Sequence, residues 1–137
     1  MKKLSLLFAF IICLTACSEK EGNLTISGAV KGLKKGTLYL QKIEDTVLVT
    51  IDSVQIKGDP NFVFETTIES PQVLYLYLDK VDAIQYNDRL LFFAEPGEMT
   101  VNTTLKNFES DLIVTGSENH EKLEEYKKMI DRFDDQN

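Results

Sequence analysis

Between Leu24 and Thr115, apolar and polar residues alternate in short runs separated by turn-forming residues. Phe62 and Phe64, for example, follow the turn at 58–61 with a spacing of two. In a β-strand, successive side chains point to opposite faces, so this alternation indicates strands with one buried face. Some seven to nine short strands fit into the segment. Their number and the turns between them predict an antiparallel β-sandwich.

Two runs specify this prediction further. The run from Gln72 to Asp79 places Leu74, Leu76 and Leu78 on one face, opposite Tyr75 and Tyr77. The run 90–94 is apolar throughout, and a continuous apolar run of this length is expected for a strand that is covered on both faces.

The first 16 residues are predicted to be a signal peptide, which is removed before the mature protein folds. Lys2 and Lys3 give it a positive start, and the apolar run 4–14 is too short to span a bilayer as a helix, which needs about 20 residues. The segment 14–17, Leu-Thr-Ala-Cys, resembles the lipobox of bacterial lipoproteins. This resemblance implies that Cys17 is lipidated and becomes the first residue of the mature protein.

Lipidation at Cys17 would anchor the chain to a membrane without a membrane-spanning segment. Two or more acyl chains, palmitate among them, are enough for stable binding to the membrane. In lipoprotein sorting, as the resemblance implies it, Ser18 favours the outer membrane over inner-membrane retention. Glu19 and Glu21 are similar to a surface-export signal, although Lys20 interrupts it. We therefore expect an outer-membrane lipoprotein of the cell envelope, on either the periplasmic or the external face.

The mature chain would have 121 of the 137 residues, enough for one domain with a modest core. Loss of Lys2 and Lys3 reduces 15 basic residues to 13 against 22 acidic ones, so the formal charge changes from −7 to −9. Such acidity argues against nucleic acid as a partner. Cys13 would leave with the signal peptide and Cys17 would be acylated, so no free thiol and no disulfide are expected in the mature protein.

The apolar period changes after Gly116, where Ser117 or Asn119 can cap a helix. One helical face of the segment 117–137 carries an apolar stripe, formed by Leu123, Tyr126, Ile130 and Phe133. The stripe is too narrow to make a core alone. It must pack on the β domain, on another chain, or on a segment after residue 137. The expected organisation is thus a signal peptide (1–16), a lipidated tether (17–22), a β-sandwich (23–116) and a C-terminal helix (117–137).

Several short segments follow one another in a specific order: 24–30, 32–33, 36–40, 52–54, 61–64, 75–78, 92–98 and 115–117. Together, over roughly residues 22–130, they resemble an all-β lipoprotein domain of unknown function. That domain precedes a thioredoxin-like domain in many envelope thiol–disulfide oxidoreductases. The family's chemistry belongs to the Cys-x-x-Cys of the thioredoxin-like domain, and these 137 residues contain no such motif. The resemblance therefore implies the fold, the anchor and work beside a redox partner, but no catalytic residue.

Two acidic groupings are candidates for chemical sites. Glu95 and Glu98 flank the Pro96-Gly97 turn and could serve acid–base chemistry, but a turn with solvated carboxylates is the favoured interpretation. The aspartates 79, 82 and 88 do not follow the spacing of a calcium loop, so no metal is expected.

Two further groups complete the candidates. His120, the only histidine, is expected at the surface, because it has no partner residues for catalysis. Tyr75, Tyr77, Tyr86, Phe92 and Phe93 could line an aromatic groove for a glycan or a peptide, but core packing is the favoured explanation for most of them.

The sequence therefore predicts a non-enzymatic binding or docking module without a cofactor, anchored in the envelope through Cys17. The helix stripe is its expected contact with a protein partner. The alternative is an accessory N-terminal part of a thioredoxin-like oxidoreductase, either truncated or acting with a separate redox partner. A hydrolase using Glu95 and Glu98 is a third, less favoured class.

Overall fold

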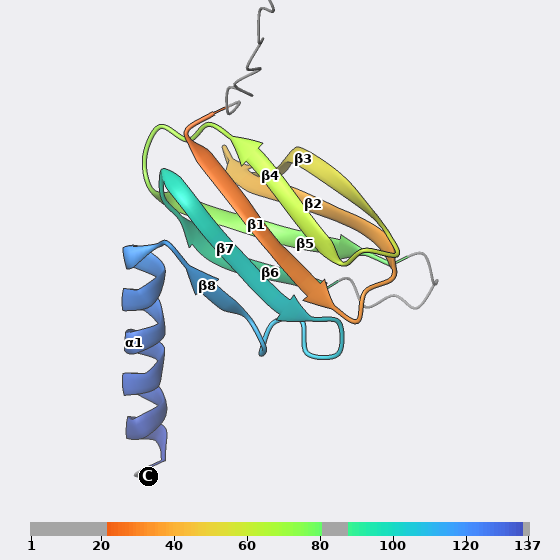
Figure 1. Ribbon diagram of the computed structural model, residues 1–137. Helices are drawn as coiled ribbons and strands as arrows, with labels where there is room; N and C mark the ends of the chain where they lie inside the picture. The colour runs from red at the N-terminus through yellow and green to blue at the C-terminus, as the bar shows by residue number, and fades with distance from the viewer. Residues whose placement is uncertain (1–21, 81–87, 136–137) are drawn as a thin grey trace, which may run out of the picture.

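The computed structural model describes residues 22–80 and 88–135. Within them, eight strands form two four-stranded sheets that pack face to face, and one helix stands at the side (Figure 1). The predicted β-sandwich followed by a C-terminal helix is confirmed.

The first sheet has the strand order β4-β1-β7-β8. Its strands are β4 (Asn61–Thr66), β1 (Leu24–Lys31), β7 (Gly97–Thr104) and β8 (Ile113–Thr115). The β1–β7 pair is parallel, whereas β1–β4 and β7–β8 are antiparallel. Gly28 interrupts the apolar alternation of β1 for a steric reason: a Cβ atom there would lie 1.7 Å from the Val101 carbonyl oxygen of β7.

The second sheet is antiparallel throughout, with the order β3-β2-β5-β6. Its strands are β3 (Val47–Lys57), β2 (Lys35–Glu44), β5 (Gln72–Asp79) and β6 (Asp88–Ala94). The register between β2 and β3 shifts after Leu40, where a bulge leaves Ile51 without a partner position. Strand β6 forms one edge of this sheet, and β3 forms the other.

The core lies between the two sheets and follows the period-two pattern. Leu74, Leu76 and Leu78 of β5 are fully buried, as are Phe64 of β4 and Phe92 of β6. Burying each such side chain stabilises the fold by about 1.5–3 kcal/mol relative to leaving it in water. The alternation in the sequence therefore separated the two faces of β5 correctly, and the structure shows that the leucine face is the buried one.

Strand β6 differs from the expectation that it is covered on both faces. Its inward residues Leu90, Phe92 and Ala94 are buried, but Leu91 on the opposite face is 37% exposed. Only Phe93, at the end nearer the helix, is partly covered. A continuous apolar run thus predicted more burial than this edge strand has, because the C-terminal helix covers only one end of the strand.

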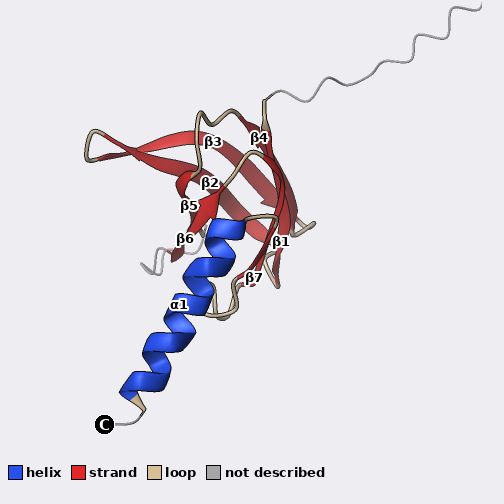
Figure 2. Ribbon diagram, turned by 90° about the vertical axis from the view of Figure 1, so that its left-hand side faces the viewer, coloured by secondary structure: helices blue, strands red, loops and turns tan. Residues whose placement is uncertain are grey.

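Helix α1 (Glu118–Asp134) begins at the sandwich and then projects away from it (Figures 1 and 2). It packs against β6 and β8 near its N-terminal end. Ser117 is the N-cap, as one of the two predicted alternatives required. No helix in the described part of the chain combines the length and the apolar character needed to cross a membrane.

Candidate functional site

Several of the residues singled out in the sequence fall outside the described ranges. Cys17, the predicted lipidation site, precedes residue 22, and Tyr86 lies between residues 80 and 88. The candidate site is therefore built from α1 and the strands beneath it.

Three acceptors hold the first turn of α1. The Ser117 hydroxyl accepts a hydrogen bond from the His120 backbone N–H at 3.1 Å. The Glu95 carboxylate, in the turn after β6, accepts from the N–H groups of Glu118 at 3.1 Å and Asn119 at 2.8 Å. A helix leaves its first N–H groups without intrahelical partners and concentrates positive potential there, so a carboxylate is well placed. The favoured interpretation of Glu95 as a solvated turn residue is wrong. Its carboxylate caps the helix, although 23 positions separate Glu95 from Glu118 in the sequence.

His120 fastens the same turn to the edge of the second sheet. Its side chain is only 3% exposed, and Nδ1 accepts a hydrogen bond from the Phe93 backbone N–H of β6 at 3.3 Å. An accepting Nδ1 leaves the proton of the neutral ring on Nε2, which lies 3.6 Å from the Glu124 carboxylate. The expectation of a surface histidine is wrong. The strand edge beneath it, which offers a backbone donor, could not be located from sequence alone.

Burial lowers the pKa of His120 below its ordinary value of 6.5, because the imidazolium form loses solvation there. The Glu124 carboxylate opposes this shift, and the Lys127 ammonium reinforces it. Neutral His120 is the form that can accept from Phe93. The attachment of the helix base is therefore built around an uncharged ring.

The rest of α1 is open to solvent. Leu123 is partly buried, but Tyr126 is 55% exposed, Ile130 39% and Phe133 64%. Met129, which the predicted stripe did not include, is 49% exposed and extends the apolar surface. The structure thus keeps most of the predicted contact stripe away from the sandwich core.

The aromatic residues divide between two environments. Phe92 is in the core, whereas Tyr75 and Tyr77 lie on the outer face of the second sheet and are partly exposed. Tyr77 stacks on Tyr39 with ring centroids 5.8 Å apart, and the Arg89 guanidinium lies 4.9 Å from the centre of the Tyr77 ring. Core packing therefore explains Phe92 but not the two tyrosines, of which Tyr77 forms an outward cluster with Tyr39 and Arg89.

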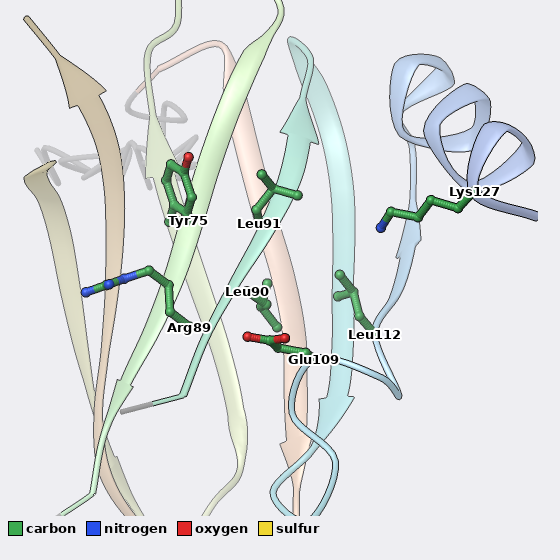
Figure 3. A pocket seen from close by; sticks show the side chains of 7 residues that line it. All are labelled: Tyr75, Arg89, Leu90, Leu91, Glu109, Leu112 and Lys127. Atoms are coloured by element: carbon green, nitrogen blue, oxygen red, sulfur yellow. The ribbon is translucent and has the colours of Figure 1, made fainter. Parts of the chain in front are cut away.

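A groove of about 390 Å³ lies where α1 leaves β6. Seven residues line it, Tyr75, Arg89, Leu90, Leu91, Glu109, Leu112 and Lys127. In Figure 3 the Lys127 side chain reaches from α1 toward β6, and Arg89 points the other way, away from the helix. The groove thus combines the leucines of β6 and Leu112 with charged side chains, among them Lys127 of α1.

The stretch from β1 to the base of α1 identifies the family of this chain. Residues 24–123 match a family described as a domain of unknown function, DUF4369. The chain belongs to this family. The matched stretch of the DUF4369 domain contains both sheets, the Ser117 cap and His120, and it ends at Leu123. Most of the exposed stripe on α1 therefore lies beyond the match.

This chain has no match among the curated proteins or among the solved structures. Across residues 22–80 and 88–135, no group of three or more His, Cys, Asp or Glu side chains is arranged to hold a metal ion. Of the three aspartates weighed as calcium ligands, Asp88 forms an ion pair with Lys80, and Asp82 lies outside the described residues.

Proposed function

We propose that this DUF4369 chain is a lipid-anchored envelope lipoprotein that performs no catalysis and docks a protein partner through the exposed stripe of α1. The anchor part of the proposal is supported by the sequence, in which a short apolar run ends in the lipobox-like segment 14–17. The outer membrane is the proposed location, because Ser18 follows Cys17.

The observation that carries the docking part is the exposure of apolar side chains on a helix that is fixed at only one end. Tyr126, Met129 and Phe133 are each about half exposed or more, and they lie on one side of α1. In proteins, most of the stability of a helix comes from packing of its apolar face rather than from intrinsic helix propensity. Contact with a partner would bury this face and stabilise the distal half of the helix.

A lipidation test addresses the anchor. Metabolic labelling with a palmitate analogue is expected to label the wild-type protein, and Cys17→Ala is expected to abolish both the label and the membrane fraction. Equal labelling of the two proteins would refute the anchor, and it would leave the docking part to be judged separately.

Crosslinking in intact cells tests the docking. A photoreactive residue at Ile130 is expected to yield a discrete crosslinked product, and Tyr126→Asp with Phe133→Asp is expected to reduce it at least fivefold. Leu123 is unsuitable for such a change, because it is partly buried at the helix base.

The matched control is Lys128→Asp with Arg132→Asp, which introduces the same two side chains on the other side of α1. This control is the harsher change for the helix itself, since basic residues suit a helix C-terminus. Equal loss of product in both double variants would contradict docking through the stripe.

The same experiment addresses the alternative function. The order of segments that resembles the domain preceding thioredoxin-like domains favours work beside a redox partner. A crosslinked protein that carries Cys-x-x-Cys would support an accessory role in thiol–disulfide exchange. A partner without that motif would favour the general docking role.

A further inference from the structure

The hydrogen bond from Phe93 to His120 shows which way the backbone of β6 faces. Because the Phe93 N–H points to the helix, Phe93 and its partner Val73 form a non-hydrogen-bonded pair between β6 and β5. Hydrogen-bonded and non-hydrogen-bonded pairs alternate along an antiparallel ladder. The N–H and C=O groups of Leu91 and Arg89, two and four residues earlier, therefore also point away from β5.

The end of this edge that carries Phe93 is closed by α1, whereas no other described strand pairs with the rest of the edge. No described residue donates a hydrogen bond to the outward backbone groups of Leu91 or accepts one from them. The groove of about 390 Å³ lies beside this stretch of β6, with Leu91 and Leu112 among its lining residues (Figure 3). Unpaired backbone groups form a template for another strand, and the groove beside them offers leucine side chains together with charged ones.

The opposite edge of the same sheet is a poorer template. Strand β3 carries the bulge at Ile51, which breaks the regular succession of outward backbone groups. Strand β6 pairs with β5 in one uninterrupted register from Asp88 to Ala94. A regular, unprotected edge with a groove beside it is thus found at β6.

We propose that the β6 edge from Arg89 to Leu91 binds an extended segment of a protein partner, which adds a strand to the second sheet beneath α1. The segment carries apolar residues at alternate positions, so that one face of it packs on Leu91 and Leu112. Main-chain hydrogen bonds provide affinity in this mode of recognition, and the groove selects the side chains. This surface is separate from the α1 stripe, so the proposal goes beyond the docking function proposed above.

The probe is a seven-residue peptide of alternating valine and threonine with capped ends, added to the purified full chain. The measured quantity is hydrogen exchange at the Leu91 amide. The peptide is expected to slow this exchange at least tenfold, because the amide becomes bonded to the added strand. The matched control peptide is N-methylated at those alternate residues whose N–H groups would face β6, so it keeps every side chain and loses the backbone donors.

Variants of the chain complete the test. Leu91→Pro removes the outward N–H without removing a bond to β5, since proline is tolerated at strand edges. It is expected to weaken peptide binding at least tenfold, whereas Leu91→Ala, which keeps the N–H, weakens it less than threefold. Tyr126→Asp with Phe133→Asp is expected to leave binding unchanged, which separates this result from docking through the stripe. Absence of protection, or equal protection by both peptides, would overturn the proposal.

Discussion

The two halves of α1 belong to one continuous helix, yet the first half is bonded to the sandwich and the second half is exposed to solvent. In the first half, Ser117 and Glu95 satisfy free backbone N–H groups, and His120 is bonded to β6. In the second half, Tyr126 and Phe133 are more than half exposed. The family match ends at Leu123, between the two halves.

This difference shows how a rigid attachment can be combined with an open surface. At 1.5 Å per residue, the 17 residues of α1 span about 25 Å, so the distal turns stand well clear of the sandwich. Polar contacts fix the direction of the helix at its base, and the apolar side chains beyond them are left for contacts outside the domain. The difference can be tested by removing the base contacts one at a time.

The largest effect is expected at His120. His120→Ala should lower the free energy of unfolding by about 2–3 kcal/mol, because it empties a buried site and leaves the Phe93 N–H without its acceptor. Phe133→Ala, in the distal half, should change it by less than about 0.5 kcal/mol.

Chemical denaturation, monitored by circular dichroism, measures the free energy of unfolding of His120→Ala and of Phe133→Ala. Similar losses in the two variants would mean that the distal half is held as firmly as the base, and the comparison between the halves would fail.

The sandwich was predictable because burial in a sheet repeats every two residues. The run Leu74-Tyr75-Leu76-Tyr77-Leu78 divides its residues between two faces, whatever strands lie next to it. The parallel pairing of β1 with β7 was not predictable, since it joins residues about 73 positions apart. No local pattern specifies which distant strand becomes a neighbour.

The next effect concerns the N-cap. Ser117→Ala should lower the free energy of unfolding by about 1 kcal/mol, since the His120 N–H loses its side-chain acceptor. Ser117→Asp, which restores an acceptor, is the matched control and should recover most of the loss. A smaller loss than in His120→Ala is expected because the imidazole bond to β6 remains. A larger loss would reverse the ranking of the base contacts.

The cap and the stripe of the candidate site were predictable, whereas the attachment was not. Ser117 and the spacing of Leu123, Tyr126, Ile130 and Phe133 are local patterns that a single helix determines. The roles of Glu95 and His120 depend on the tertiary position of β6 relative to the helix. A glutamate beside Pro96-Gly97 has the same local sequence whether it faces water or a helix N-terminus.

The smallest effect is expected from pH, because the ring of His120 stays in place and only its proton binding changes. The pKa of His120 in the folded protein lies below its ordinary value of 6.5, since burial disfavours the charged ring despite the nearby Glu124 carboxylate. Between these two pKa values the unfolded chain binds more protons than the folded one, so the free energy of unfolding rises with pH. The protein should therefore be fully stabilised above about pH 6.5 and should lose stability as the pH falls below it.

Denaturation at pH 5.5 and at pH 7.5 measures this pH effect. His120→Asn is the control, because its amide oxygen can accept from Phe93 and does not titrate. The difference in stability between the two pH values should be smaller in this variant than in the wild type. An equal difference in both proteins would assign the pH dependence to other groups. A neutral histidine at the base would then no longer distinguish the fixed half of α1 from the exposed half.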